Sequence, residues 1–196
     1  MKRICVFCGS SPGNNPEYRE AARTLGRILA GRNIELVFGG GRVGLMNEIA
    51  NTVLGAGGRV TGVIPQSLVD REVAHTGISE LRVTGSMHER KALMAELSDG
   101  FIALPGGIGT FEEFMEIITW GQLGFHRKPC GLLNTLGFYD GLLEFLDHAV
   151  REGFLHDANR DSILVSESPE ELLDLFTAYI PPSVDKAEKA LGELDN

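Results

Sequence analysis

The chain has 196 residues, of which 43% are hydrophobic and 23% are charged. This length and composition suit one globular domain that buries its core without disulfides or a structural metal. The net charge of −9 argues against binding to nucleic acid or to a membrane surface, since both need a basic patch. No apolar run reaches the roughly 20 residues that span a bilayer, and the first apolar stretch is too short for a signal peptide, so we expect a cytoplasmic protein.

Strand and helix patterns alternate along the chain. Continuous apolar runs predict strands at residues 3–8, 35–38, 59–64, 81–83, 100–104, 130–133 and 163–165. Apolar residues three and four positions apart predict helices at residues 16–31, 44–54, 87–97, 110–123, 139–152 and 169–179. This alternation is typical of a doubly wound, Rossmann-like α/β fold, with a parallel sheet covered by helices on both faces. We expect a single domain over residues 1–180 and a polar tail over residues 181–196.

Three glycine-rich loops directly follow expected strands, at residues 8–11, 39–44 and 105–110. In a doubly wound fold, ligands bind beyond the carboxyl ends of the strands, where these loops lie. Glycine brings backbone N–H groups close to a ligand, and the helix that follows each loop adds a positive dipole end. The loops therefore predict a nucleotide-binding site. Its candidate residues in the first two loops and the helix after them are Gly9, Ser10, Gly40, Gly41 and Met46.

Two other patterns in this part of the chain suggest different chemistry. The second loop matches G-x-G-x-x-G, which is typical of dinucleotide binding, but the acidic residue expected at the end of the next strand is absent. Cys5 and Cys8 form C-x-x-C, a spacing seen in redox and zinc sites. Residues three apart on a strand point to opposite faces, so we interpret both as small buried residues. We expect no metal and no cofactor.

The third loop allows two interpretations. Thr110 stands where a helix N-cap is expected, and with Glu113 it fits a capping box. Its hydroxyl could instead bind a phosphate oxygen together with the N–H groups of Gly107 and Gly109. Three glycines exceed what a cap requires, which favours the phosphate interpretation. One strand–helix unit earlier, Arg90 and Lys91 at the start of a helix could supply cations to the same cleft.

Taken together, these motifs resemble the LOG family, whose members are often also labelled "possible lysine decarboxylase". The match includes C-G-S-S at residues 8–11, G-G-G-x-x-G-L-M at 39–46, M-H-x-R-K at 87–91 and P-G-G-x-G-T-x-x-E at 105–113. It continues to about residue 165. The long third-loop motif together with M-H-x-R-K is highly specific.

The resemblance implies a cytokinin riboside 5′-monophosphate phosphoribohydrolase that acts as a homodimer. Such enzymes hydrolyse the N-glycosidic bond of N6-modified adenosine 5′-monophosphates, often including AMP, and release a free base and ribose 5-phosphate. The resemblance also implies that Arg90 and Glu113 form the catalytic pair. It implies substrate contacts at Glu72, Lys91, Gly107, Ile108, Gly109, Thr110, Phe111, Glu112 and Thr119.

Two alternatives remain at this stage. Relatives of this superfamily include carriers that bind a nucleotide-bearing cofactor, such as the molybdenum cofactor, without cleaving it. The intact pair Arg90 and Glu113 favours an enzyme over a carrier. A pyridoxal phosphate decarboxylase would need a Schiff-base lysine, and Lys91 beside Arg90 is better suited to bind phosphate.

The expected helix at residues 110–123 carries more apolar side chains than one face can hold. We therefore expect one side of it to pack on the sheet and the other on a second subunit, consistent with the implied homodimer.

Overall fold

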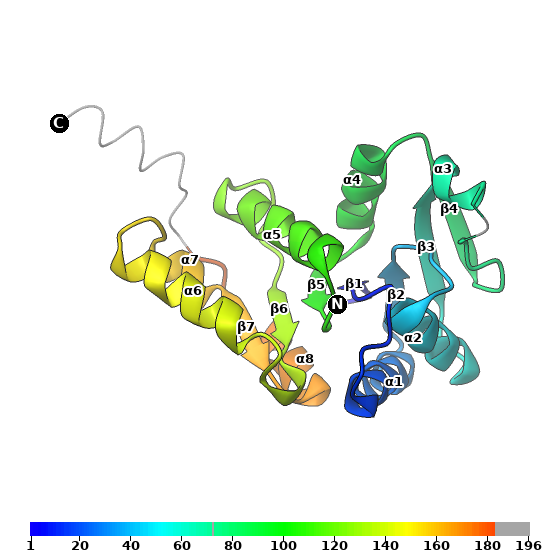
Figure 1. The fold of residues 1–196 in the computed structure, drawn as a ribbon, viewed down its shortest axis with the longest axis horizontal. Helices are drawn as coiled ribbons and strands as arrows, with labels where there is room; N and C mark the ends of the chain where they lie inside the picture. Colours follow the sequence, from blue (N-terminus) through cyan, green and yellow to red (C-terminus); the bar gives the residue numbers. More distant parts are fainter. Residues whose placement is uncertain (72, 183–196) are drawn as a thin grey trace.

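The structure is a computed structural model, and it describes residues 1–71 and 73–182. Seven parallel strands form one sheet with the order β4-β3-β2-β1-β5-β6-β7 (Figure 1). The strands are β1 (Arg3–Phe7), β2 (Glu35–Phe38), β3 (Val60–Pro65), β4 (Glu80–Thr84), β5 (Gly100–Ala103), β6 (Cys130–Leu133) and β7 (Ile163–Ser166). The order reverses between β1 and β5, which confirms the doubly wound fold. Loops that leave these two strands therefore diverge and open a crevice at the carboxyl edge.

Helices cover both faces of the sheet. One face carries α1 (Pro16–Gly31), α2 (Gly44–Gly55) and α8 (Pro169–Ala178), and the other carries α4 (Met87–Leu97), α5 (Ile108–Gln122) and α6 (Asp140–Arg151) (Figure 1). Three short helices were not expected from the sequence: α3 (Gln66–Val69), a 3₁₀ turn (Thr135–Gly137) and α7 (Asp157–Asp161). Each is too short to show a helical repeat of apolar residues.

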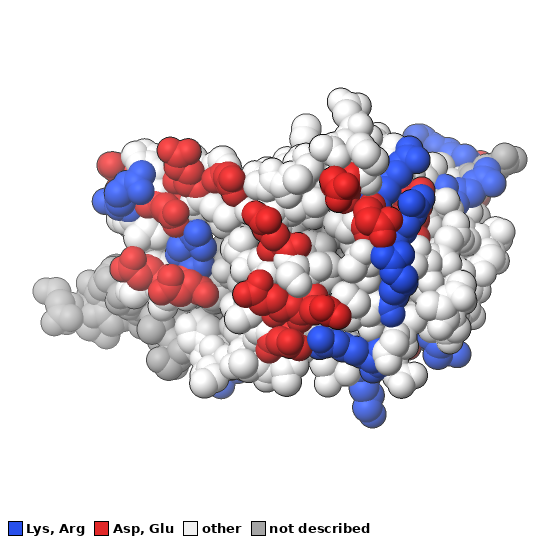
Figure 2. Space-filling model, turned by 90° about the horizontal axis from the view of Figure 1, so that it is seen from below, with Lys and Arg blue, Asp and Glu red and all other residues white. Residues whose placement is uncertain are grey.

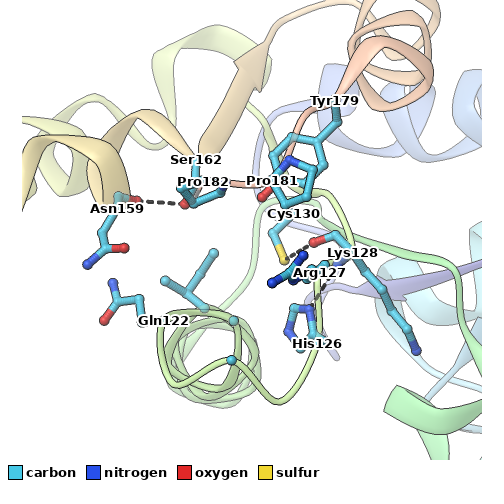
Figure 3. A pocket seen from close by; sticks show the side chains of 13 residues that line it. Gln122, His126, Arg127, Lys128, Cys130, Asn159, Ser162, Tyr179, Pro181 and Pro182 are labelled. Atoms are coloured by element: carbon cyan, nitrogen blue, oxygen red, sulfur yellow. Dashed lines mark hydrogen bonds between the residues drawn. The ribbon is translucent and has the colours of Figure 1, made fainter. Parts of the chain in front are cut away.

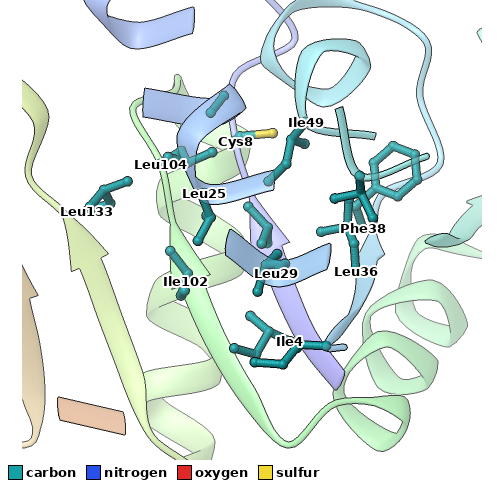
Figure 4. Packing of buried hydrophobic residues seen from close by; sticks show 14 of the residues in the cluster. Ile4, Cys8, Leu25, Leu29, Leu36, Phe38, Ile49, Ile102, Leu104 and Leu133 are labelled. Carbon is teal, nitrogen blue, oxygen red and sulfur yellow. The ribbon is translucent and has the colours of Figure 1, made fainter. Parts of the chain in front are cut away.

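The core consists of two apolar clusters, one on each side of the sheet. Along β1, Ile4 belongs to the cluster on the α1 side and Cys5 to the cluster on the α5 side. In Figure 4, Leu25 and Leu29 of α1 pack in the same cluster as Ile4. Cys8 also belongs to this first cluster, so Cys5 and Cys8 lie on opposite sides of the sheet, as the strand period requires. Both are free, buried thiols.

The expected elements match the structure apart from their ends. The largest difference is α5, which begins at Ile108, two residues before the expected start. Gly109, a weak helix former, lies inside its first turn, where the helix is held by packing of the later turns. The expected tail begins with Pro181 and Pro182, and its remaining residues, 183–196, lie outside the described residues.

Among residues 1–71 and 73–182, no helix is both long and apolar enough to span a membrane. On the face shown in Figure 2, acidic side chains gather over the left and centre, and the basic side chains beside them form a narrow column. This face therefore offers no broad basic surface for a polyanion.

Candidate active site

A cleft of about 330 Å³ opens at the carboxyl edge of the sheet. It lies where the loops after β1, β2 and β5 meet the start of α5. The residues that line it are Cys8, Ser10, Gly39, Gly41, Val43, Met46, Ile64, Leu68, Val73, Arg90, Gly107, Ile108, Gly109, Thr110 and Glu113. The structure thus brings residues from all three glycine-rich loops together with Arg90 and Glu113.

Backbone hydrogen bonds hold the three loops against one another. Gly9 N–H donates to the Pro105 carbonyl (3.1 Å), and Leu45 N–H donates to the Gly9 carbonyl (3.0 Å). Gly44 has a φ of +53°, and a β-carbon there would overlap the backbone of Ser10. The bare backbone at Gly44 therefore allows the first and second loops to touch.

The first turn of α5 presents unpaired backbone donors to the cleft. Gly107 is the N-cap, and within the described chain no side chain caps this helix. The first helical hydrogen bond runs from Phe111 N–H to the Gly107 carbonyl (3.2 Å), so the N–H groups of Ile108, Gly109 and Thr110 have no helical acceptor. Uncapped donors at the positive end of a 15-residue helix make an anion-binding site.

The expected N-cap role of Thr110, and with it the capping box, is wrong. Thr110 is the third helical residue, it is only 3% exposed, and it lines the cleft. A β-carbon on Gly106 would overlap the Thr110 hydroxyl, so glycine at position 106 leaves room for that hydroxyl. Because the helix begins earlier than expected, Glu113 is not placed to reach back as a capping partner.

Glu113 instead forms an ion pair with Arg90 inside the cleft. Arg90 Nη1 lies 3.1 Å from Glu113 Oε1, and the two side chains are 10% and 13% exposed. Arg90 Nε also donates to the Val63 carbonyl at 3.1 Å, so the guanidinium is fixed at two points. Burial raises the pKa of the Glu113 carboxyl, while the Arg90 charge acts in the opposite direction.

Lys91 points away from the cleft although it follows Arg90 in the sequence. Its Nζ lies 2.5 Å from Glu112 Oε1 and 3.0 Å from Glu116 Oε1, both on α5. Lys91 of α4 thus pairs with Glu112 of α5 and links the two helices, and neither residue lines the cleft.

Four more of the expected contact residues, Phe111, Thr119, Gly9 and Gly40, are not among the residues that line the cleft. Phe111 packs edge-on against Tyr139, and Thr119 is exposed with its hydroxyl donating to the Met115 carbonyl. Gly9 lines a neighbouring hollow, and Gly40 turns the second loop with a φ of +72°. Glu72 lies outside the described residues.

One wall of the cleft was not expected from the sequence. It is apolar and consists of Val43, Ile64, Leu68 and Val73. Its residues come from a loop, the end of β3 and the segment around α3. In the sequence, hydrophobicity is the one property that these residues share. Hydrophobicity alone does not distinguish such a wall from the core.

A second hollow, of about 140 Å³, lies at the opposite edge, near the amino ends of β6 and β7 (Figure 3). Asn159 and Gln122 lie on one side of it, and Cys130 and Arg127 on the other. Several of its polar side chains bind the protein itself: His126 bonds to the Ile117 carbonyl (2.9 Å), and Ser162 donates to the Asn159 carbonyl (2.7 Å).

The fold and the cleft define a class: a doubly wound α/β protein with an uncapped helix start and a buried Arg–Glu ion pair at the switch point. Residues 46–176 match the family described as "Possible lysine decarboxylase". Cytokinin riboside 5′-monophosphate phosphoribohydrolase LOG1 from Arabidopsis thaliana is 50% identical over 195 residues, covering 100% of this chain and 92% of the relative. The chain therefore belongs to this family, as its motifs indicate.

Solved structures share the fold. The X-ray structure of TM1055 superposes with a TM-score of 0.70 at 26% identity, covering 91% of this chain and 100% of that one. The molybdenum cofactor binding protein from Rippkaea orientalis superposes with a TM-score of 0.68 at 22% identity, covering 91% of this chain and 97% of that one. At this level of identity, the second likeness concerns the fold alone.

Proposed function

We propose that this chain hydrolyses the N-glycosidic bond of adenosine 5′-monophosphates, including N6-modified ones, to a free base and ribose 5-phosphate. The observation that carries the proposal is the Arg90–Glu113 ion pair, which lies in one cleft with the uncapped start of α5. The name of the Arabidopsis relative, a cytokinin riboside 5′-monophosphate phosphoribohydrolase, supports the same reaction.

The start of α5 is the proposed phosphate site. The N–H groups of Ile108, Gly109 and Thr110 lack helical acceptors, and the Thr110 hydroxyl lies beside them. A phosphate held there would accept charge-assisted hydrogen bonds and lie at the positive end of the helix dipole. This anchor lies one helical turn from Glu113, so it can hold the ribose close to the carboxylate.

Glu113 is the proposed catalytic carboxylate. Cleavage of an N-glycoside passes through a ribosyl cation, which a nearby negative charge stabilises and which water must attack. A largely buried carboxylate stabilises this charge more strongly than one in water. Arg90 fixes its position and favours its ionised form, because the guanidinium opposes the rise in pKa that burial causes.

The apolar wall is the proposed site for the base. Leu68 and Val73 of this wall, together with Met46, line the cleft and offer apolar surface to a flat, uncharged ring. In this arrangement the three parts of a nucleoside monophosphate meet three kinds of protein surface: apolar side chains, an ion pair and backbone N–H groups.

The test is an assay of base release. Purified enzyme is incubated with AMP or with N6-isopentenyladenosine 5′-monophosphate, and both the base and ribose 5-phosphate are measured by chromatography. Equimolar release of both products from either substrate is expected. Binding of both nucleotides without product formation would instead favour the carrier function.

The decarboxylase label does not fit the residues present. Among the described residues that line the cleft, none is a lysine that could form a Schiff base with pyridoxal phosphate. Lys91 is engaged by Glu112 and Glu116, and Lys128 lies at the opposite edge of the sheet.

We also propose a cytoplasmic homodimer. Its support is apolar surface on and beside α5: Ile108 is 87% exposed and Phe125 is 74% exposed, while Met115 and Trp120 are only partly covered. The free, buried cysteines suit a reducing compartment. Light scattering at micromolar concentration should give twice the chain mass, and a monomeric mass would contradict the dimer.

A further inference from the structure

The glycines of the second loop lack side chains for different physical reasons. Gly40 and Gly44 have φ values of +72° and +53°, which favour glycine through the backbone. Gly39 is not among the residues with positive φ, so an alanine there would fit the backbone. What prevents a side chain at Gly39 is therefore the space around it.

That space is occupied by the Arg90 guanidinium. A β-carbon built on Gly39 would overlap Arg90 Nη2, and it would lie 3.2 Å from Cζ and 3.7 Å from Nε. These are the three nearest atoms to that β-carbon, and all belong to Arg90. The missing side chain of Gly39 thus makes room for a protein side chain.

The guanidinium cannot move from this position without losing contacts. Its Nε donates to the Val63 carbonyl at the end of β3, and its Nη1 pairs with Glu113 on α5. Nη1 also lies 3.7 Å from the Met87 sulfur. The planar guanidinium therefore crosses the ends of β2 and β3 and meets Glu113. It has room to do so because Gly39 has no side chain.

We propose that Gly39 is a positioning residue for the reaction: by having no β-carbon, it sets where the Arg90 guanidinium lies and so how that guanidinium meets Glu113. This inference rests on the proposed catalytic roles of Arg90 and Glu113. It gives the first glycine of the G-x-G-x-x-G pattern a function distinct from close approach to a phosphate.

The central test is Gly39→Ala. The overlapping atom is the end of a flexible side chain, so the chain should fold, with a lower melting temperature because the shifted guanidinium gives up contacts. We expect kcat to fall about 100-fold, the scale for a displacement of about 1 Å at a reacting centre, with KM little changed. The acidic limb of the kcat–pH profile should move to higher pH, because a displaced Arg90 lowers the pKa of Glu113 less.

Two variants serve as matched controls. Gly55→Ala changes a glycine whose built β-carbon has no heavy atom within 4 Å, and it should behave as wild type. Arg90→Lys removes Nη2, and the lysine Nζ takes about the place of Cζ, 3.2 Å from the new β-carbon, a close contact that the flexible lysine relieves by a small shift. Adding Gly39→Ala to Arg90→Lys should therefore lower kcat little further, which is the signature of two residues acting through one contact.

Each contrary result has a distinct meaning. Normal kinetics of Gly39→Ala beside an impaired Arg90→Lys would overturn the positioning role, and so would an equal loss in both backgrounds. If Gly39→Ala fails to fold, the backbone and not the Arg90 side chain must move to make room for the new β-carbon. This result would also overturn the positioning role. Normal kinetics of Arg90→Lys would count against the catalytic role of Arg90. A crystal structure of Gly39→Ala would then still show whether the guanidinium has moved from the Val63 carbonyl.

Discussion

The two edges of the sheet each carry a hollow, and the polar groups in them are used differently. At the amino edge, Lys128 Nζ donates to the Ala95 carbonyl (2.8 Å) and the Cys130 thiol to the Lys128 carbonyl (3.6 Å). At the carboxyl edge, the first N–H groups of α5 have no helical acceptor, and Glu113 shares a cleft with them. Several polar groups at the amino edge thus bind the protein itself, whereas the first N–H groups of α5 at the carboxyl edge remain available for a ligand.

This difference distinguishes the carboxyl-edge cleft, a candidate functional site, from the amino-edge hollow. Both hollows contain charged side chains, so charge alone does not identify the functional one. Polar groups that bind other parts of the protein hold the fold together, and groups that face open space are available for chemistry. Changes at the carboxyl edge should therefore alter kinetics, and equivalent changes at the amino edge should leave kinetics unchanged.

The largest expected effect is that of Glu113→Gln. The amide keeps the size of the side chain but removes the negative charge that we propose stabilises the ribosyl cation. Turnover of the folded variant should fall about 10²–10⁴-fold. The free energy of unfolding should also fall, by up to about 3–5 kcal/mol, because the buried Arg90 guanidinium loses its charged partner. Steady-state kinetics and chemical denaturation measure the two quantities.

The matched control is Glu96→Gln. Glu96 is an exposed glutamate on α4 beside an amino-edge hollow, and its replacement should leave kcat unchanged. A folded Glu113→Gln enzyme with normal turnover would place the chemistry elsewhere in the cleft.

Removal of the substrate phosphate should have the next largest effect. A hydrogen bond to a charged group contributes about 1.5–3 kcal/mol, so if at least two of the donors at the start of α5 bind the phosphate, kcat/KM for AMP should exceed that for adenosine about 10²–10⁴-fold or more. Similar values for the two substrates would contradict the anchor at the start of α5. Inorganic phosphate should compete with AMP at that site.

The pH dependence should identify Glu113. Burial raises the pKa of its carboxyl, and the carboxylate is the active form, so activity is lost as pH falls through this raised pKa. The acidic limb of kcat/KM should thus lie above the ordinary range of a glutamate, with about a tenfold loss per pH unit below it. A limb that persists unchanged in Glu113→Gln would belong to another group.

The smallest effect is expected for Thr110→Val. Valine has nearly the same shape but no hydroxyl, so one hydrogen bond to the phosphate is lost and KM for AMP should rise about tenfold. The amino-edge counterpart, Ser162→Ala, removes a hydroxyl that donates to the Asn159 carbonyl, and it should change stability but not KM. If KM for AMP is unchanged in Thr110→Val, the backbone N–H groups alone would form the phosphate site.

The sequence predicts the sheet, its helices and the loops of the cleft, because these depend on local patterns of apolar residues and glycine. Arg90 and Glu113, which the resemblance implies as a pair, do meet in the structure. The direction of Lys91 could also have been anticipated, since adjacent residues on a helix do not share a face. Arg90 turns toward the sheet and Lys91 toward α5.

Other features depend on tertiary contacts that no local pattern records. The early start of α5 overrides the weak helix propensity of Gly109 and makes Thr110 part of the helix. The apolar wall from Leu68 and Val73 is indistinguishable by composition from core. The proposed role of Gly39 depends on its contact with Arg90, which lies 51 positions later in the sequence, so no local pattern reveals it.

The central position of β1 has a consequence for how the chain folds. Ile4 pairs with Leu36 on one side and with Gly100 on the other. During synthesis, the first strand can gain one neighbour early, but its second edge stays open until more than half of the chain has been made. Closing such distant contacts slows folding, and an open edge invites pairing with other chains. In the interval between the synthesis of β2 and that of β5, the open edge of β1 is therefore exposed to pairing with other chains.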